Sequence, residues 1–238
     1  MKTNGTLHLI PVGLGNAPVS AWLPSAAQEV AARLNTYIAE NAKTARAFLK
    51  LVGTSRPLQE ITIHTLGPKT DPQEIRKWLG EASRGGEIGL VSEAGCPAVA
   101  DPGAKVAAMA HSMGIRVLPW VGPSSILLAL MASGLDGQRF AFHGYAPVDA
   151  SERAKRLKLW ETESRKNSQT QILIETPYRN EAMFKALLQT LNGRKRLCVA
   201  RSLTTDDECI RTYSIDEWKS KAPPGLNKMP TIFLFLAS

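Results

Sequence analysis

One glycine- and proline-rich segment, residues 90–103, constrains the fold more than any other part of the chain. It reads Leu90-Val-Ser-Glu-Ala-Gly-Cys-Pro-Ala-Val-Ala-Asp-Pro-Gly103 and predicts a buried strand, a loop and then a helix. Asp101 is a favourable N-cap, and Pro102 suits the first helical position because its missing N–H would have no partner there. Loops between a parallel strand and a helix bind ligands in α/β folds. A tight connection without any ligand explains the segment as well.

The rest of the chain alternates short apolar runs with segments of helical period, which predicts parallel strands covered by helices. The expected strands are residues 7–12, 36–39, 60–64, 87–92, 115–120, 140–145, 172–175, 197–201 and 230–236. The expected helices are residues 25–34, 43–51, 72–83, 102–113, 123–133, 151–165 and 180–191, with a short one opened by a capping box at 214–217. We therefore expect two α/β domains, residues 1–121 and 122–238.

Composition narrows the class of protein. Of the 238 residues, 44% are hydrophobic and 21% charged, as in an ordinary globular protein with an ample core. The amino terminus has only six mostly apolar residues before Pro11, and no apolar run approaches the roughly 18 residues of a membrane span, so we expect neither a leader nor a membrane partner. Three widely separated cysteines fit a reducing compartment, which predicts a cytoplasmic protein.

The spacing of the histidines and the net charge indicate which ligands the chain can bind. The four histidines occur singly, and none has a second ligand at metal-binding spacing, so no metal site is expected. The net charge of +8 favours polyanionic partners, although many soluble proteins are this basic by chance.

Six short motifs occur along the chain in an order that is typical of one protein family. They are Ile10-Pro-Val-Gly-Leu-Gly-Asn16, the 90–103 segment, Val121-Gly-Pro-Ser-Ser125, Arg139-Phe-Ala-Phe-His-Gly-Tyr-Ala-Pro147, Ile174-Glu-Thr-Pro-Tyr-Arg179 and Val199-Ala-Arg-Ser-Leu-Thr204. Together they resemble the tetrapyrrole (corrin/porphyrin) methylase superfamily, and within it the small-subunit ribosomal RNA ribose 2′-O-methyltransferase I group. The chain departs from that group's pattern at residues 40–46, at Cys96 and at His143, which indicates a diverged member.

The resemblance implies a fold and a cofactor. It implies two α/β domains with S-adenosylmethionine in the cleft between them, and a homodimer. The implied cofactor-binding residues are Pro11, Glu93, Ala94, Gly95, Val99, Ser124, Ser125, Thr176, Ala200 and Thr231. The two serines open a helix whose free N–H groups suit a carboxylate, but capping of that helix explains them equally well. We expect a tryptophan in place of Gly95 to fill the cofactor space without unfolding the chain.

Methyl transfer to a hydroxyl needs an in-line approach and a proton acceptor. His143 is the first candidate for that catalytic base, because imidazole titrates near neutrality. Glu93 and Glu175 are the alternatives. A single histidine on a strand is more often structural, so this reading stays open beside the catalytic one.

The sequence thus favours an S-adenosylmethionine-dependent methyltransferase acting on RNA, with a ribose 2′-hydroxyl of ribosomal RNA as the specific target. RNA contacts are expected on the basic helix 151–166, at Arg153, Lys155, Arg156 and Lys158, although a solvated helix face has the same pattern. A small-molecule tetrapyrrole-type methylase, or a cofactor-binding module without catalytic activity, are the alternatives.

Overall fold

The computed structural model describes residues 5–191 and 193–237. The chain divides into two compact units, Met1–Ser124 and Ser125–Ser238, called here the N-terminal unit and the C-terminal unit. The boundary expected from the sequence follows residue 121, and the division between the units follows Ser124. Residues 1–4, which enter the expectation of no leader, lie outside the described part.

In its described part, the N-terminal unit is a five-stranded parallel sheet between two layers of helices, with strand order β3-β2-β4-β1-β5. The strands are β1 (Thr6–Leu9), β2 (Thr36–Ala39), β3 (Thr62–Thr65), β4 (Glu87–Val91) and β5 (Arg116–Pro119). The helices are α1 (Ser25–Arg33), α2 (Ala42–Val52), α3 (Pro72–Trp78), α4 (Gly80–Ser83) and α5 (Ala104–Ser112), with short 3₁₀ turns η1 (Val19–Ala21) and η2 (Leu58–Glu60).

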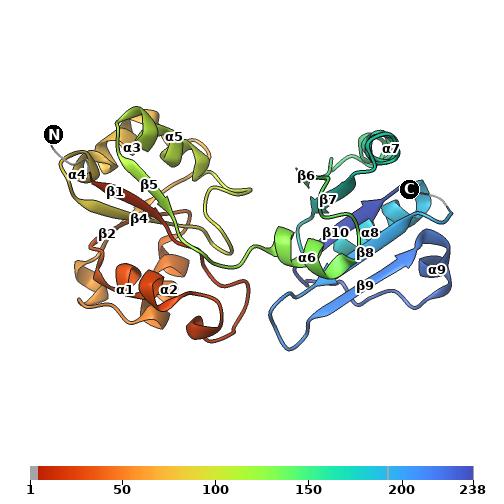
Figure 1. Cartoon of the computed structure of the whole chain (residues 1–238), viewed down its shortest axis with the longest axis horizontal. Coiled ribbons are helices and arrows are strands. Elements are labelled where there is room, and N and C mark those ends of the chain that lie inside the picture. The colour runs from red at the N-terminus through yellow and green to blue at the C-terminus, as the bar shows by residue number, and fades with distance from the viewer. Residues whose placement is uncertain (1–4, 192, 238) are drawn as a thin grey trace. The chain divides into compact units, whose positions relative to one another are not determined.

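Helices α1 and α2 cover one face of this sheet, and α3, α4 and α5 cover the other (Figure 1). Alternate strand residues supply the two cores, as the period of two requires. Tyr37 and Ala39 pack with α1 and α2, whereas Ile38 packs with the opposite layer. All three side chains are buried, so β2 is covered on both faces.

The chain leaves β1 and β4 in opposite directions across the sheet. From β1 it crosses β4 to reach β2, and from β4 it later crosses β1 to reach β5. Neighbouring parallel strands whose connections diverge in this way mark the topological switch point, where open α/β sheets bind ligands. The carboxyl ends of β1 and β4 are therefore the first place to look for a site.

The C-terminal unit is a mixed sheet in the order β6-β7-β10-β8-β9, with β6 and β7 parallel and the other pairs antiparallel. Its elements are α6 (Ser125–Ser133), β6 (Phe140–Tyr145), α7 (Ala150–Asn167), β7 (Thr170–Ile174), α8 (Asn180–Thr190), β8 (Arg196–Arg201), β9 (Cys209–Ser214), α9 (Ile215–Ser220) and β10 (Thr231–Leu236). Trp160 of α7, Phe184 of α8 and Trp218 of α9 pack with Phe233 and Phe235 of β10 in one core. Helix α6 packs near β8, β9 and β10.

The structure differs from the sequence prediction in several details. The helix expected over residues 72–83 is two helices, α3 and α4, separated next to Gly80, a residue of low helix propensity. Strand β1 ends at Leu9 rather than at residue 12. Strand β9 was not predicted. The capping box that opens α9 is present as predicted, with Ser214 and Glu217 each accepting a backbone N–H.

Candidate functional site

Three loops leave the carboxyl edge of the parallel sheet and contact one another. Val12, after β1, and Gly95, after β4, exchange two backbone hydrogen bonds, each with an N···O distance of 2.9 Å. The Cys96 thiol lies 3.3 Å from the Pro123 carbonyl oxygen, in the loop after β5. The switch point is therefore a connected surface of backbone rather than a set of independent loops.

Two glycines make this close approach possible. Gly95 is buried and has φ +75°, a left-handed conformation that costs other residues energy. Gly122 lies against Pro11, and a Cβ at Gly122 would lie 2.3 Å from the Cβ of that proline. Packing of the loops therefore requires glycine at position 122, and the backbone conformation favours glycine at position 95.

Asp101 closes the loop after β4. Its Oδ1 accepts hydrogen bonds from the Ala98 N–H at 2.9 Å and the Gly103 N–H at 2.6 Å. The helix predicted to begin at Pro102 begins at Ala104 instead, so that prediction is wrong in its starting residue. The physical reason is a turn at residues 102–103 that precedes α5, so Asp101 stabilises the loop and this turn before the helix begins.

Carboxylates gather at the same edge. An oxygen of Glu40, just after β2, lies 3.4 Å from the Glu93 backbone nitrogen. Burial raises the pKa of Glu40, and repulsion from Asp101 and Glu93 raises it further. Burial also raises the pKa of Asp101, against the effect of its two backbone donors. Negative charge at this edge is compatible with a cationic ligand group.

The residues that the resemblance assigned to the cofactor are divided between the two units. In the N-terminal unit these are Pro11, Glu93, Ala94, Gly95, Val99 and Ser124; in the C-terminal unit they are Ser125, Thr176, Ala200 and Thr231. Thr176 follows the carboxyl end of β7, and Thr231 begins β10 opposite Arg201 at the end of β8. Ala200 is the next residue in that register, opposite Ile232. The last three therefore share one end of the mixed sheet.

The donor set of the N-terminal edge fits S-adenosylmethionine. Glu93 and Ala94 are exposed, so their backbone groups and the Glu93 carboxylate are accessible to a ligand. The carboxylates of this edge suit the positive charges of the sulfonium and the amino group. When bound, the cofactor supplies an electrophilic methyl group; the protein binds it and orients it.

The three candidate bases have different surroundings. His143 Nε2 lies 2.6 Å from Oε1 of Gln171, and the imidazole stacks on Trp160 with ring centroids 4.2 Å apart. Glu175 is 1% exposed, pairs with Arg179 at 2.7 Å and accepts the Thr176 N–H at 2.8 Å. These contacts engage both oxygens of Glu175 and hold its carboxylate in place. The catalytic role of His143 stays a prediction.

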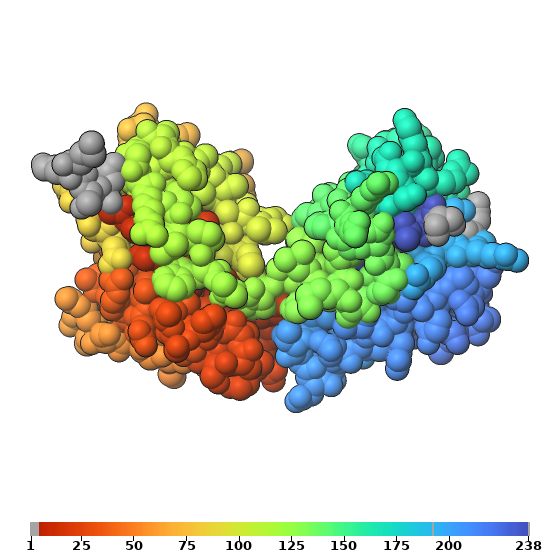
Figure 2. Space-filling model, in the orientation of Figure 1, coloured from red at the N-terminus to blue at the C-terminus, as the bar shows by residue number. Residues whose placement is uncertain are grey.

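The predicted RNA-binding residues lie on α7, which forms a ridge on the C-terminal unit (teal in Figure 2). Arg153 donates from Nη1 to the carbonyl oxygens of Val148 at 2.9 Å and Pro147 at 3.3 Å. Lys155 pairs with Glu152 at 2.8 Å and Lys158 pairs with Glu161 at 3.1 Å, and both pairs belong to the helix itself. Arg156 is exposed. Much of the basic charge of α7 is thus engaged within the unit.

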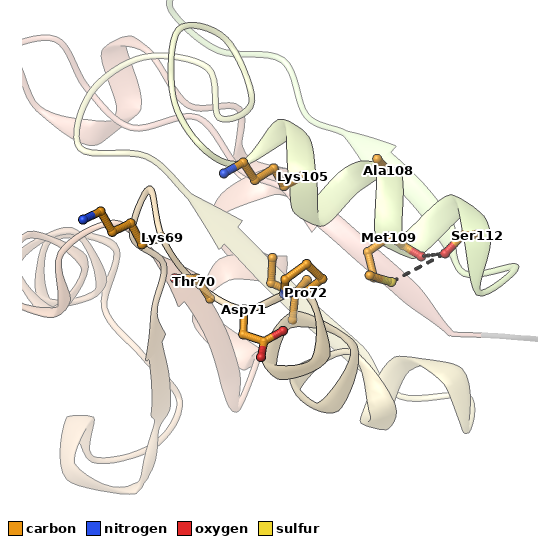
Figure 3. Close-up of a pocket in the computed structure, with 9 residues that line it drawn as sticks. Lys69, Thr70, Asp71, Pro72, Lys105, Ala108, Met109 and Ser112 are labelled. Carbon is orange, nitrogen blue, oxygen red and sulfur yellow. Dashed lines mark hydrogen bonds between the residues drawn. The ribbon is translucent and has the colours of Figure 1, made fainter.

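A groove of about 770 Å³ that the sequence did not indicate lies beside α3 and α5. Figure 3 shows Lys69 and Lys105 toward one end of it, and Met109 and Ser112 toward the other. The Lys105 ammonium donates to the Pro68 carbonyl oxygen at 2.9 Å. No short motif marks the groove, because its walls come from segments far apart in the chain.

Within residues 5–191 and 193–237, no three histidine, cysteine or acidic side chains are grouped as a metal site would require. Across the same residues no helix combines the length and the apolar character needed to cross a bilayer.

Comparison with known proteins identifies the family. A family model for tetrapyrrole (corrin/porphyrin) methylases matches residues 6–218. The chain is 32% identical over 210 residues to ribosomal RNA small subunit methyltransferase I of Xylella fastidiosa, which covers 88% of this chain and 72% of that protein. It is 29% identical over 208 residues to the protein of the same name from Bacillus subtilis, covering 87% of this chain and 67% of that protein.

Solved structures share the fold. The methyltransferase CobJ aligns with a TM-score of 0.62 at 17% identity, covering 98% of this chain and 94% of that chain. Uroporphyrin-III-C-methyltransferase from Thermus thermophilus aligns with a TM-score of 0.55 at 17% identity, covering 98% and 93%. At this identity the likeness concerns the fold alone. The match over most of the chain, the switch-point loops and the two α/β units agree, and the chain belongs to the tetrapyrrole (corrin/porphyrin) methylase family as an S-adenosylmethionine-dependent methyltransferase.

Proposed function

We propose that this methyltransferase acts on RNA and methylates a ribose 2′-hydroxyl of small-subunit ribosomal RNA. The observation that carries the proposal is the similarity, near 30% identity over about nine tenths of the chain, to enzymes named ribosomal RNA small subunit methyltransferase I. The net charge of +8 supports a polyanionic substrate. The substrate in the name of uroporphyrin-III-C-methyltransferase does not transfer to this chain, because the two sequences are only 17% identical.

We further propose that the cofactor is bound by the ten residues assigned above. The support is that those of the N-terminal unit lie in loops at the carboxyl edge of its parallel sheet, and that Thr176, Ala200 and Thr231 share one end of the mixed sheet. The enzyme acts as a homodimer in the cytoplasm, by resemblance to its family for the dimer and by the three free cysteines for the compartment.

His143 accepts the proton of the ribose hydroxyl in this proposal. Gln171 Nε2 donates to the Gln169 carbonyl oxygen at 3.0 Å, which leaves Oε1 of Gln171 as the acceptor that faces His143. Nε2 of the imidazole then carries the hydrogen, and Nδ1 keeps the lone pair that takes a proton. On this assignment Gln171 selects the tautomer that catalysis needs.

The test is transfer of labelled methyl groups from S-adenosylmethionine to small ribosomal subunits from a strain that lacks its own enzyme of this kind. Label that survives alkaline hydrolysis as a dinucleotide is expected, because a methylated 2′-oxygen cannot attack the neighbouring phosphate. Label on a base, or on a tetrapyrrole but not on RNA, contradicts the proposal.

A further inference from the structure

Helix α2 carries positive charge without any carboxylate. Its sequence, Ala-Lys-Thr-Ala-Arg-Ala-Phe-Leu-Lys-Leu-Val, has three cations in eleven residues and no aspartate or glutamate. Lys43, Arg46 and Lys50 are spaced i, i+3 and i+7, so they share one face of the helix. The opposite face is buried against α1 and the sheet through Phe48 and Leu49.

The three cations of this face are exposed, and their side chains form no hydrogen bond or ion pair with the described residues. Helix α7 differs in this respect. It has six cations and three glutamates in eighteen residues, and two of its lysines pair with glutamates of the same helix. The basic charge of α2 is thus less neutralised than that of the helix which the sequence favoured.

The position of α2 relates this charge to the candidate site. The helix follows β2 directly, with Asn41 as its N-cap, and β2 is hydrogen-bonded to β4. Glu40, between β2 and the cap, lies against the Glu93 backbone in the switch-point loop. Lys43 is therefore at the edge that carries the loops, and Lys50 lies about 10 Å further along the helix, at 1.5 Å per residue.

We propose that the face of α2 formed by Lys43, Arg46 and Lys50 binds the phosphate backbone of the substrate RNA beside the candidate site. This inference rests on the proposed RNA substrate. Lysine and arginine neutralise phosphates, and no carboxylate of the helix opposes them. An anionic membrane is a weaker match, because Leu51, 52% exposed, is the single large apolar side chain of α2 that is exposed among the described residues, whereas interfacial helices present a full apolar face.

The test compares a triple variant, Lys43→Gln, Arg46→Gln and Lys50→Gln, with the parent. Glutamine has a helix propensity close to that of lysine and arginine, so the helix is retained. Binding to small-subunit ribosomal RNA made by transcription is measured by fluorescence anisotropy over a range of salt concentrations. Three lost phosphate contacts reduce the log–log salt slope by about 2 to 3, at roughly 0.7 to 0.9 per contact. The melting temperature and the affinity for S-adenosylmethionine are expected to match those of the parent.

A charge-matched control neutralises three exposed lysines of the C-terminal unit, with Lys185→Gln, Lys219→Gln and Lys228→Gln. It removes the same net charge, so it corrects for the general attraction between the basic protein and RNA. The α2 variant must lose clearly more of the salt slope than this control.

The outcomes are distinguishable. If both triple variants have the same slope while the parent binds and methylates RNA, the proposal for α2 is wrong and the proposed function stands. If the parent binds no RNA at any salt concentration, both fail. If the α2 variant loses binding to anionic phosphatidylserine vesicles and keeps its RNA salt slope, the face is a membrane contact and the proposal is overturned.

Discussion

Trp120 Nε1 donates a hydrogen bond to Nδ1 of His8 at 3.1 Å, and this contact fixes the tautomer of a buried imidazole. Because Nδ1 accepts, Nε2 carries the ring hydrogen and donates it to Glu87 Oε1 at 3.0 Å. Burial lowers the pKa of His8 despite the neighbouring carboxylate. Trp120 begins the loop after β5, so the pair joins the centre of the sheet to one of the site loops.

The contact between His8 and Trp120 leads us to expect a lower free energy of unfolding in mild acid. The pKa of His8 is lower in the folded chain than its ordinary value of 6.5, so the unfolded chain binds more protons below that pH. The stabilisation is complete above pH 6.5 and declines as the pH falls toward the folded pKa. A protonated ring would also set an Nδ1–H against the Trp120 N–H.

Urea unfolding of the parent and of His8→Gln at pH 8, 7, 6 and 5 measures this effect. The variant is expected to be less stable at pH 8 and to depend less on pH across the range. Glu87, whose pKa is lowered to about 2 first by its hydrogen bond with Arg33, titrates below this window. Parallel pH dependence in the two proteins would show that His8 is not the group responsible.

The loop after β4 predicts opposite effects at two neighbouring positions. Gly95 has φ +75° and is buried, so Gly95→Ala should lower the free energy of unfolding by about 1–2 kcal/mol. The same strain is expected in Gly95→Trp, so that variant should also lose stability, and whether it still folds stays a prediction. Ala94 is exposed, and Ala94→Trp should leave the stability within about 0.5 kcal/mol while weakening cofactor binding.

Urea unfolding and calorimetric titration with S-adenosylmethionine check both variants. Unchanged cofactor affinity in Ala94→Trp would remove this residue from the cofactor site.

Much of the fold could be predicted because it depends on local pattern. Strands such as β2 and β4 are short and are separated by segments of helical period. All of β2 is buried, and so is β4 after Glu87. The carboxyl ends of such parallel strands share an edge of the sheet. The gathering of the loops followed from that rule. Strand β9 escaped prediction because it is a half-buried edge strand with Arg211 exposed, so its apolar pattern is weak.

The details of the site depend on contacts that no short segment encodes. The start of α5 depends on how Asp101 reaches back to Ala98, a residue in a left-handed conformation. Whether a cation of α7 is free to bind RNA depends on its hydrogen-bond partners in the folded chain. Arg153, for example, donates to the Pro147 carbonyl oxygen, which precedes the helix. A count of lysines and arginines says nothing about these partners, so the sequence alone favours the longer α7 over α2.

Asp101 is predicted to stabilise the chain through both of its carboxylate oxygens, which share the Ala98 N–H. Asp101→Ala leaves the Ala98 and Gly103 N–H groups without this acceptor and should cost about 1–2 kcal/mol, in the range of a lost N-cap. Asp101→Asn keeps Oδ1, which accepts from both groups, but puts an amide donor in place of Oδ2, 3.0 Å from the Ala98 nitrogen, so it should lose less stability than Asp101→Ala without matching the parent. Urea unfolding measures the stability of both variants. Equal losses of stability in the two would mean that the negative charge of Asp101 is the stabilising feature.

Arg153 and Arg156, one turn apart on α7, are predicted to differ in role: Arg153 stabilises the fold and Arg156 contacts RNA. Arg153 holds the carbonyl oxygens of Pro147 and Val148, so Arg153→Ala should lower the melting temperature. Arg156 is exposed, so Arg156→Ala should leave the melting temperature unchanged and reduce the RNA salt slope by about 0.7 to 0.9 if it contacts a phosphate. Anisotropy and thermal unfolding are measured on both. An unchanged slope in Arg156→Ala would mean that this face of α7 is simply solvated.

Replacing His143 is expected to lower kcat without changing the binding of RNA or of the cofactor. In His143→Phe an aromatic ring still stacks on Trp160, but the proton acceptor is lost, so kcat should fall by about 100-fold or more while KM for RNA and the affinity for S-adenosylmethionine stay near those of the parent. Gln171 is fully buried and would lose its contact with the imidazole, so a moderate loss of stability of about 1–3 kcal/mol is expected as well. A loss of kcat with an unchanged KM in the folded protein is a result that a purely structural role would not produce. If kcat stays at the parent value in the folded fraction, His143 only packs β6 against α7, and the exposed carboxylate of Glu93 becomes the base to test.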